Sequence, residues 1–147
     1  MAKKINIQYA ALPYAIREGK LWVLLVTSRD TGRWIIPKGW PIKDLNGAKV
    51  AATEAFEEAG VRGPVAKAPF AEFDYMKRVG MIKQKYCHVQ VHALRVAEEL
   101  EDWPEKSQRR REWVLPAEAA RRVAEERLVE MFSNLPESVG DTDPFGL

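Results

Sequence analysis

The chain has 147 residues and a net charge of +2, and 46% of its residues are hydrophobic. A chain of this length can build one core and hardly two, so we expect a single domain over residues 1–147. The small net charge disfavours a nucleic-acid partner, and the single cysteine excludes an internal disulfide. No stretch has the ~18 apolar residues that a membrane span requires. These features predict a cytoplasmic protein without a membrane partner.

Apolar patterning predicts six strands, which lie in chain order at residues 5–17, 21–27, 34–36, 70–77, 85–96 and 113–114. Pro13 in the first of these is typical of an edge strand or a bulge. A turn at Glu18 and Gly19 joins the first two strands into a hairpin, and Gly80 joins the fourth to the fifth. Residues 37–44 form a loop that leads into a helix.

Two helices are predicted. Asn46 should cap the start of the first helix, and Gly60 should end it in a left-handed conformation. The second helix should begin at Pro116 and continue as one amphipathic element through Ala120, Val123, Leu128 and Phe132. We expect irregular tails at residues 1–4 and 136–147. Strands and helices in this order predict an α/β fold, with a mixed sheet between helices.

Three glutamates lie close together on the first predicted helix. Glu54, Glu57 and Glu58 occupy positions i, i+3 and i+4, and Arg62 is the only basic residue at neighbouring positions. Two unit charges about 5 Å apart repel by roughly 3 kcal/mol at an effective dielectric of about 20, so a bound cation would stabilise the cluster. Oxygen ligands without His or Cys favour Mg²⁺ or Mn²⁺. A solvated acidic helix face is the alternative interpretation, because Glu pairs are common on exposed helices.

Residues 39–61 resemble the Nudix box, the signature G-x5-E-x7-R-E-U-x-E-E-x-G-U, in which U is a bulky aliphatic residue. The matching positions are Gly39, Glu54, Glu57, Glu58, Gly60 and Val61, with Ala55 as a weak match. Leu45 stands where the first glutamate belongs, and it could instead form a hydrophobic staple with Val50. Thr53 replaces the arginine that, in the family, holds a metal-binding glutamate in place. Thr53 cannot hold Glu57 in that way.

This resemblance implies the Nudix fold and a divalent-metal-dependent hydrolase that cleaves a diphosphate linkage. It implies that Mg²⁺ or Mn²⁺ is held by Glu54, Glu57, Glu58 and the Gly39 carbonyl, with Glu57 and Glu58 as catalytic residues. Members of the superfamily place the general base differently. Here the candidates left open are Glu58 and the acidic stretch of Glu98, Glu99, Glu101, Asp102 and Glu105.

Within the superfamily the chain is similar to the diphosphoinositol and diadenosine polyphosphate phosphohydrolase branch. The motifs that carry this likeness are Ile36-Pro37-Lys38-Gly39, Phe73-x-Tyr75-x-Lys77 and Glu112-Trp113. Basic residues near the box favour a small substrate with several phosphates, and the substrate-binding candidates are Arg33, Lys38, Lys77, Lys83 and Lys85. Aromatic residues could stack on an adenine or serve as core anchors, and these are Trp34, Trp40 and Tyr75.

We therefore predict a pyrophosphohydrolase acting on a nucleoside-diphosphate-type compound, a dinucleoside polyphosphate or a diphosphoinositol polyphosphate. Two alternatives stay open. The first is a catalytically silent Nudix module that binds a nucleotide or polyphosphate, which the departures at Leu45 and Thr53 motivate. The second is an RNA 5′-end pyrophosphohydrolase, which the near-neutral charge disfavours. The sequence leaves open the number of metal ions and whether the chain forms a homodimer.

Overall fold

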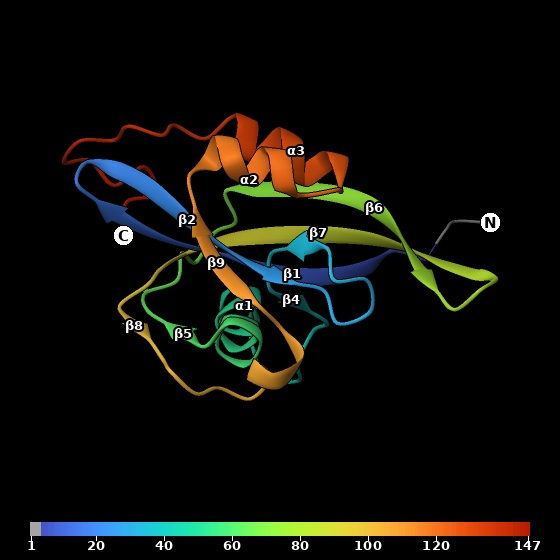
Figure 1. Cartoon of the computed structure of the whole chain (residues 1–147). Helices are drawn as coiled ribbons and strands as arrows, with labels where there is room; N and C mark the ends of the chain where they lie inside the picture. Colours follow the sequence, from blue (N-terminus) through green and yellow to red (C-terminus); the bar gives the residue numbers. More distant parts are fainter. Residues whose placement is uncertain (1–3) are drawn as a thin grey trace.

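Over residues 4–147, which the computed structural model describes, the chain forms a seven-stranded mixed sheet with helices on both faces (Figure 1). Its strands are β1 (Asn6–Arg17), β2 (Lys20–Thr27), β3 (Trp34–Ile35), β4 (Lys38–Gly39), β6 (Ala71–Val79), β7 (Lys83–Arg95) and β9 (Arg111–Val114). Their order is β3-β2-β1-β7-β6, with β4 paired to β1 and β9 paired to β2. The short strands β5 (Val61–Arg62) and β8 (Glu98–Glu99) pair separately. The predicted α/β class is confirmed.

β1 lies inside the sheet, between β2 and a parallel β7, so the prediction of an edge strand is wrong. One side of β1 pairs first with β4, at Tyr9 and Ala10, and then with β2 from Tyr14 onward. Pro13 lies between these two stretches, so its missing N–H falls where the strand changes partner. The predicted hairpin between β1 and β2 is confirmed. Its turn residues Glu18 and Gly19 both have positive φ, 51° and 74°, as a type I′ turn requires.

The first predicted helix is present, but it is not α-helical throughout. Helix α1 (Gly47–Glu54) continues into a π-helical turn, η1 (Ala55–Ala59). Asn46 caps the start, where its side-chain oxygen accepts a hydrogen bond from the Lys49 N–H at 2.9 Å, and Gly60 ends the element with a φ of 67°. Both predicted ends are therefore confirmed. The wider π turn changes where the last two glutamates face relative to Glu54.

Small side chains hold this helix close to the sheet. Ala51, Ala55 and Ala59 are fully buried and pack in one cluster with Leu24 and Val26 of β2. A larger cluster lies on the opposite face, beneath α2 (Pro116–Arg122) and α3 (Glu126–Ser133). Figure 1 shows α1 on one side of the sheet and this helix pair on the other. The alanine face therefore fixes the distance between the box glutamates and the strands.

The prediction of one continuous helix after Pro116 is wrong. Val123 has an extended backbone, with ψ at 145°, and separates α2 from α3. It forms a bridge with Trp34 and is buried in the larger core cluster. Glu125 then caps α3 by accepting a hydrogen bond from the Arg127 N–H. Burial and pairing of Val123 therefore override the amphipathic pattern that suggested a single element.

The tail beyond Pro136 has no helix or named strand among its residues, as predicted, but it is anchored to the sheet. The Asp143 carboxylate accepts hydrogen bonds from the Tyr14 hydroxyl and forms an ion pair with Arg95 at 2.9 Å. Most of the other predicted tail, residues 1–3, lies outside the described residues. Within residues 4–147, no helix is both long and apolar enough to cross a membrane.

Candidate functional site

A cavity of about 270 Å³ opens between the box helix, β4 and the segment that precedes β9. We call it the carboxylate cavity. Its lining residues are Gln8, Ser28, Arg29, Asp30, Ile35, Lys38, Gly39, Trp40, Glu54, Glu58, Lys77, Glu105 and Arg109. A larger cavity, of about 550 Å³, lies between β6 and α3 and contains no box residue. The chemistry that the sequence suggests therefore belongs to the smaller cavity.

Two of the box glutamates face each other here. Glu58 is only 4% exposed, and its Oε1 has no hydrogen-bond partner among the described residues. Burial raises the pKa of Glu58 to about 8; Arg109 opposes this shift, whereas Glu54 and Glu105 add to it. Burial also raises the pKa of Glu54. An unsatisfied carboxylate oxygen in a buried, acidic setting is costly, so a cation at this position would stabilise it.

Gly39 lies in close contact with one member of this pair. A Cβ built at Gly39 would collide with the Glu54 carboxylate, so the glycine backbone lies directly against that group. Pairing of Gly39 with Tyr9 of β1 holds this backbone in place. Mg²⁺ is commonly bound through one or two carboxylates and keeps several waters. Two carboxylates beside a close-lying backbone therefore fit Mg²⁺ or Mn²⁺, although residues 4–147 contain no set of three or more His, Cys, Asp or Glu arranged as metal ligands.

Glu57 is placed differently from the two facing glutamates. Its side chain is half-buried and does not line the carboxylate cavity, although it is near enough to Glu54 for its charge to add to the rise that burial causes in the pKa of Glu54. The π turn gives a physical reason for this placement, because i→i+5 bonding widens the turn and changes the direction of the side chain from the one it would have in an α-helix. The structure brings Gly39, Glu54 and Glu58 together. The assignment of Glu57 as a ligand and catalytic residue stays a prediction.

One carboxylate of the acidic stretch reaches the site. Of the five candidates for the base in that stretch, Glu105 alone lines the carboxylate cavity. Glu99 instead accepts a hydrogen bond from the Trp113 indole and pairs with Arg111. The Glu105 N–H donates to the Glu57 carbonyl at 3.0 Å, which ties this segment to η1. Glu105 is therefore the member of the stretch positioned to take a proton from a water in the cavity.

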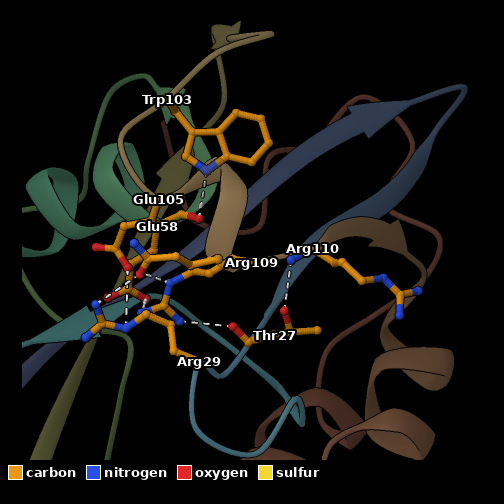
Figure 2. Close-up of polar contacts among 8 residues, drawn as sticks. Thr27, Arg29, Glu58, Trp103, Glu105, Arg109 and Arg110 are labelled. Atoms are coloured by element: carbon orange, nitrogen blue, oxygen red, sulfur yellow. Dashed lines mark hydrogen bonds and ion pairs between the residues drawn. The ribbon is translucent and has the colours of Figure 1, made fainter.

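Arg109 is a site residue that the sequence reasoning missed. Its side chain is 7% exposed and lies between Glu105 and Glu58, as Figure 2 shows. It belongs to a run of three arginines whose guanidinium groups diverge. Arg110 lies over the Trp34 ring, and Arg111 donates to the Ala59 and Leu100 carbonyls. The sequence held no signal that distinguishes these three residues.

The predicted phosphate-binding lysines lie at different distances from the carboxylates. Lys38 and Lys77 line the carboxylate cavity. Burial lowers the pKa of Lys38, and the nearby charge of Lys77 lowers it further. Lys77 and Lys85 each place their Nζ over the Trp40 ring, at 5.4 and 5.3 Å from its centroid. The site therefore presents cations opposite its carboxylates.

The other two predicted substrate-binding residues, Arg33 and Lys83, do not line the carboxylate cavity. Arg33 lines an adjoining cavity of about 370 Å³, which shares Lys38 and Lys77 with the carboxylate cavity and also contains Trp34 and Tyr75. Lys83 is exposed at the start of β7 and lines neither cavity. Lys38 and Lys77 therefore lie in the carboxylate cavity, and Arg33 and Lys85 lie beside them. Lys83 lies on the β6–β7 hairpin, outside both cavities.

Comparison of the amino-acid sequence with curated proteins identifies the family of this chain. Nudix hydrolase 12, mitochondrial, of Arabidopsis thaliana is 36% identical over 103 residues, which cover 68% of this chain and 51% of the relative. The human diphosphoinositol polyphosphate phosphohydrolase 3-beta is 34% identical over 97 residues, 62% of this chain and 53% of the relative. This chain belongs to the Nudix superfamily. It spans about half the length of the curated Nudix relatives it matches, and no protein-family model matches it.

Solved structures show the Nudix fold directly. The C. elegans Ap4A hydrolase binary complex matches with a TM-score of 0.65 and 16% identity, over 87% of this chain and 93% of that chain. The Nudix domain of Shewanella oneidensis NrtR, complexed with ADP ribose, matches with a TM-score of 0.68 and 14% identity, over 90% and 86%. The predicted Nudix fold is confirmed, and the resemblance to diphosphoinositol polyphosphate phosphohydrolases is confirmed by curated relatives.

Proposed function

We propose that this Nudix chain is a Mg²⁺- or Mn²⁺-dependent pyrophosphohydrolase that cleaves a diphosphate linkage in a small phosphorylated molecule. One observation carries the proposal: the buried, unsatisfied oxygen of Glu58 lies beside Glu54 in a cavity whose lining also includes Lys38 and Lys77. Carboxylates that need a cation and lysines that can bind phosphate oxygens therefore share one cavity. We also propose a cytoplasmic location. The names of several relatives instead include the word mitochondrial.

Each residue has a proposed role. Glu54, Glu58 and the Gly39 backbone would hold the metal, which supplies charge neutralisation and a more acidic bound water. Lys38 and Lys77 would bind the phosphate oxygens. Glu105 is the proposed acceptor for the proton of the attacking water, because it lines the same cavity. These roles assign binding to one set of side chains and proton transfer to another.

Glu57 is a further proposed ligand and catalytic residue on the strength of the box alone. This role requires its side chain to turn toward the cavity that Glu54 and Glu58 already line. Arg33, Lys83 and Lys85 are proposed to contact phosphates more distant from the metal. Of these, Lys85 contacts a residue of the cavity lining, because its Nζ lies over the Trp40 ring.

The proposed substrates follow from the relatives and from these cations. Relatives of this chain are named as diphosphoinositol polyphosphate phosphohydrolases, and structural neighbours include an Ap4A hydrolase and a domain complexed with ADP ribose. We propose that this chain acts on one of these three classes: diphosphoinositol polyphosphates, dinucleoside polyphosphates or other nucleoside diphosphate derivatives. Lys77 and Lys85 lie over the Trp40 ring and Lys38 lies over the Tyr75 ring, and cations grouped in this way suit a substrate with several phosphates.

The test is a panel assay. The purified chain, with Mg²⁺ or Mn²⁺, is incubated with diadenosine polyphosphates, diphosphoinositol polyphosphates and nucleoside diphosphate derivatives, and phosphate-containing products are quantified. We expect metal-dependent turnover of at least one class and its loss in Glu58→Gln. Turnover that is unchanged by chelation, or by Glu58→Gln in a folded protein, would contradict the proposed site.

A catalytically silent Nudix module is the second candidate. Two observations favour it: the Thr53 hydroxyl is engaged within its own helix, and Glu57 lies outside the cavity lining. Such a module would bind members of the same panel in calorimetry without releasing product. Binding without turnover in the presence of Mg²⁺ or Mn²⁺ would therefore replace the hydrolase proposal with this one.

A further inference from the structure

The box helix lacks the cation that the Nudix signature places next to its glutamates. Thr53 occupies that position, and its hydroxyl donates to the Lys49 carbonyl at 2.9 Å. The side chain is therefore turned back along the helix and does not approach either Glu54 or Glu58. Between Gly47 and Ala59 the single basic residue is Lys49, which is exposed. The buried Glu58 and the half-buried Glu54 therefore receive no positive partner from their own element.

Arg109 supplies a positive charge from the opposite wall of the cavity. Its Nη2 lies 3.7 Å from the unsatisfied Oε1 of Glu58, and the two side chains are 7% and 5% exposed. This separation is an ion-pair distance and is longer than a hydrogen bond, so the Glu58 oxygen keeps its lone pairs for another partner.

The guanidinium group is held rigidly by two other acceptors (Figure 2). Its Nε donates to Glu105 Oε1 at 2.8 Å, and its Nη1 donates to the Thr27 carbonyl at 3.0 Å. The neighbouring Arg110 N–H donates to the Thr27 hydroxyl at 2.8 Å, which fixes the backbone as well. The Trp103 indole donates to the Glu58 carbonyl at 3.1 Å, so the same segment contacts the glutamate at its backbone.

We propose that Arg109 is a positioning residue that supplies, from outside the box helix, the cation that the helix itself lacks, and that it acts on Glu58 rather than on Glu57. It holds the Glu58 carboxylate in the orientation that faces the proposed divalent cation, and this role rests on the proposed metal site. The planar fork of arginine satisfies Thr27 and Glu105 and still presents Nη2 to Glu58. Lysine is not equivalent, because its single ammonium cannot reach three acceptors in this fixed geometry.

Mn²⁺ affinity without substrate tests this role. Calorimetric titration is run on wild type, Arg109→Gln, Arg109→Lys and the double variant Arg109→Gln/Thr53→Arg, with Arg110→Gln as the control. Arg110 is adjacent in sequence but does not line the carboxylate cavity. We expect both Arg109 variants to bind Mn²⁺ about 10-fold more weakly or worse, as outer-shell changes commonly do. Arg110→Gln should bind like wild type, and Thr53→Arg should recover part of the loss.

The outcomes separate this inference from the proposed function. Wild type that does not bind Mn²⁺ would overturn both. The positioning role alone would be overturned if Arg109→Gln bound Mn²⁺ as tightly as wild type does, or more tightly. A raised KM with unchanged Mn²⁺ affinity would place Arg109 on the substrate and would also overturn it. If Arg109→Gln does not fold by circular dichroism, Arg109→Lys gives the same comparison with the charge retained.

Discussion

One wall of the carboxylate cavity is the box helix. Another wall, which we call the irregular wall, is formed by residues 103–109, whose helical part is the short 3-10 helix η2 (Lys106–Gln108). The helical wall is fixed by its Asn46 cap, by Gly60 and by buried alanines that pack on the sheet. The irregular wall is fixed mainly by hydrogen bonds from single groups to backbone carbonyls and carboxylates. The helix supplies two of the proposed metal ligands, and the segment supplies the groups that we propose to orient them and to take the proton.

This difference predicts different consequences for changes on the two walls. Changes at the helical wall remove ligands and should abolish metal binding. Changes at the irregular wall leave the ligands present and should weaken binding or catalysis by smaller factors. Charges on the outer face of the β6–β7 hairpin, away from both walls, should affect stability alone.

The largest effect is expected at Glu58. We expect Glu58→Gln to lower kcat/KM by more than the ~10–100-fold typical of outer-shell changes, because a buried ligand oxygen is lost. Steady-state kinetics on the best substrate of the panel measure this change. Glu57→Gln is the matched variant, and the cavity geometry predicts a smaller loss for it. A larger loss at Glu57 would mean that the π turn rearranges when metal binds.

Gly39→Ala should come next. The added Cβ collides with the Glu54 carboxylate, so either that side chain moves out of the ligand position or the β4 backbone shifts. We expect weaker Mn²⁺ binding with only a small loss in the free energy of unfolding, because the colliding atoms belong to the end of a flexible side chain that can move. Calorimetry and urea denaturation measure the two quantities. The double variant Gly39→Ala/Glu54→Ala should be as stable as Glu54→Ala alone; a lower stability would mean that the added Cβ strains the β4 backbone.

A smaller effect is expected for the lysines. Lys77 lines the carboxylate cavity, whereas Lys83 lies on the same hairpin but outside it. Lys77→Gln should raise KM about 10-fold, near the 1.4 kcal/mol that a lost phosphate contact can contribute, and Lys83→Gln should change KM little. Initial-rate measurements over a substrate series test the pair. Equal effects would show that the hairpin acts through its overall charge.

The sequence predicts those features of the site that arise from interactions between residues close together in the chain. The ends of the box helix follow from Asn46 and Gly60, whose side-chain and backbone preferences act within a few residues. The role of Arg109 depends on the Thr27 carbonyl, 82 positions away, which no local pattern contains. The interior position of β1 and the break at Val123 also depend on pairing with distant strands.

The smallest effect concerns His88 on the outer face of β7. Hydrogen bonds to Asp74 and then to Glu72 raise the pKa of His88 above its usual 6.5. A raised histidine pKa stabilises the folded state fully below about pH 6.5, and this contribution disappears as the pH rises through the folded-state value. Thermal unfolding of wild type and His88→Gln should differ most near pH 6 and converge at higher pH. A constant difference would assign the effect to packing.

The central claim is that Glu54 and Glu58 bind a divalent cation. It is tested most directly by calorimetric titration of Mn²⁺ into wild type and Glu58→Gln, without substrate and with folding checked by circular dichroism. The account predicts saturable binding to wild type and a loss of more than ~100-fold in affinity for the variant, beyond the range of outer-shell changes. Equal affinity in the two proteins would contradict it, because the cation would then be held by other groups or by none at this site.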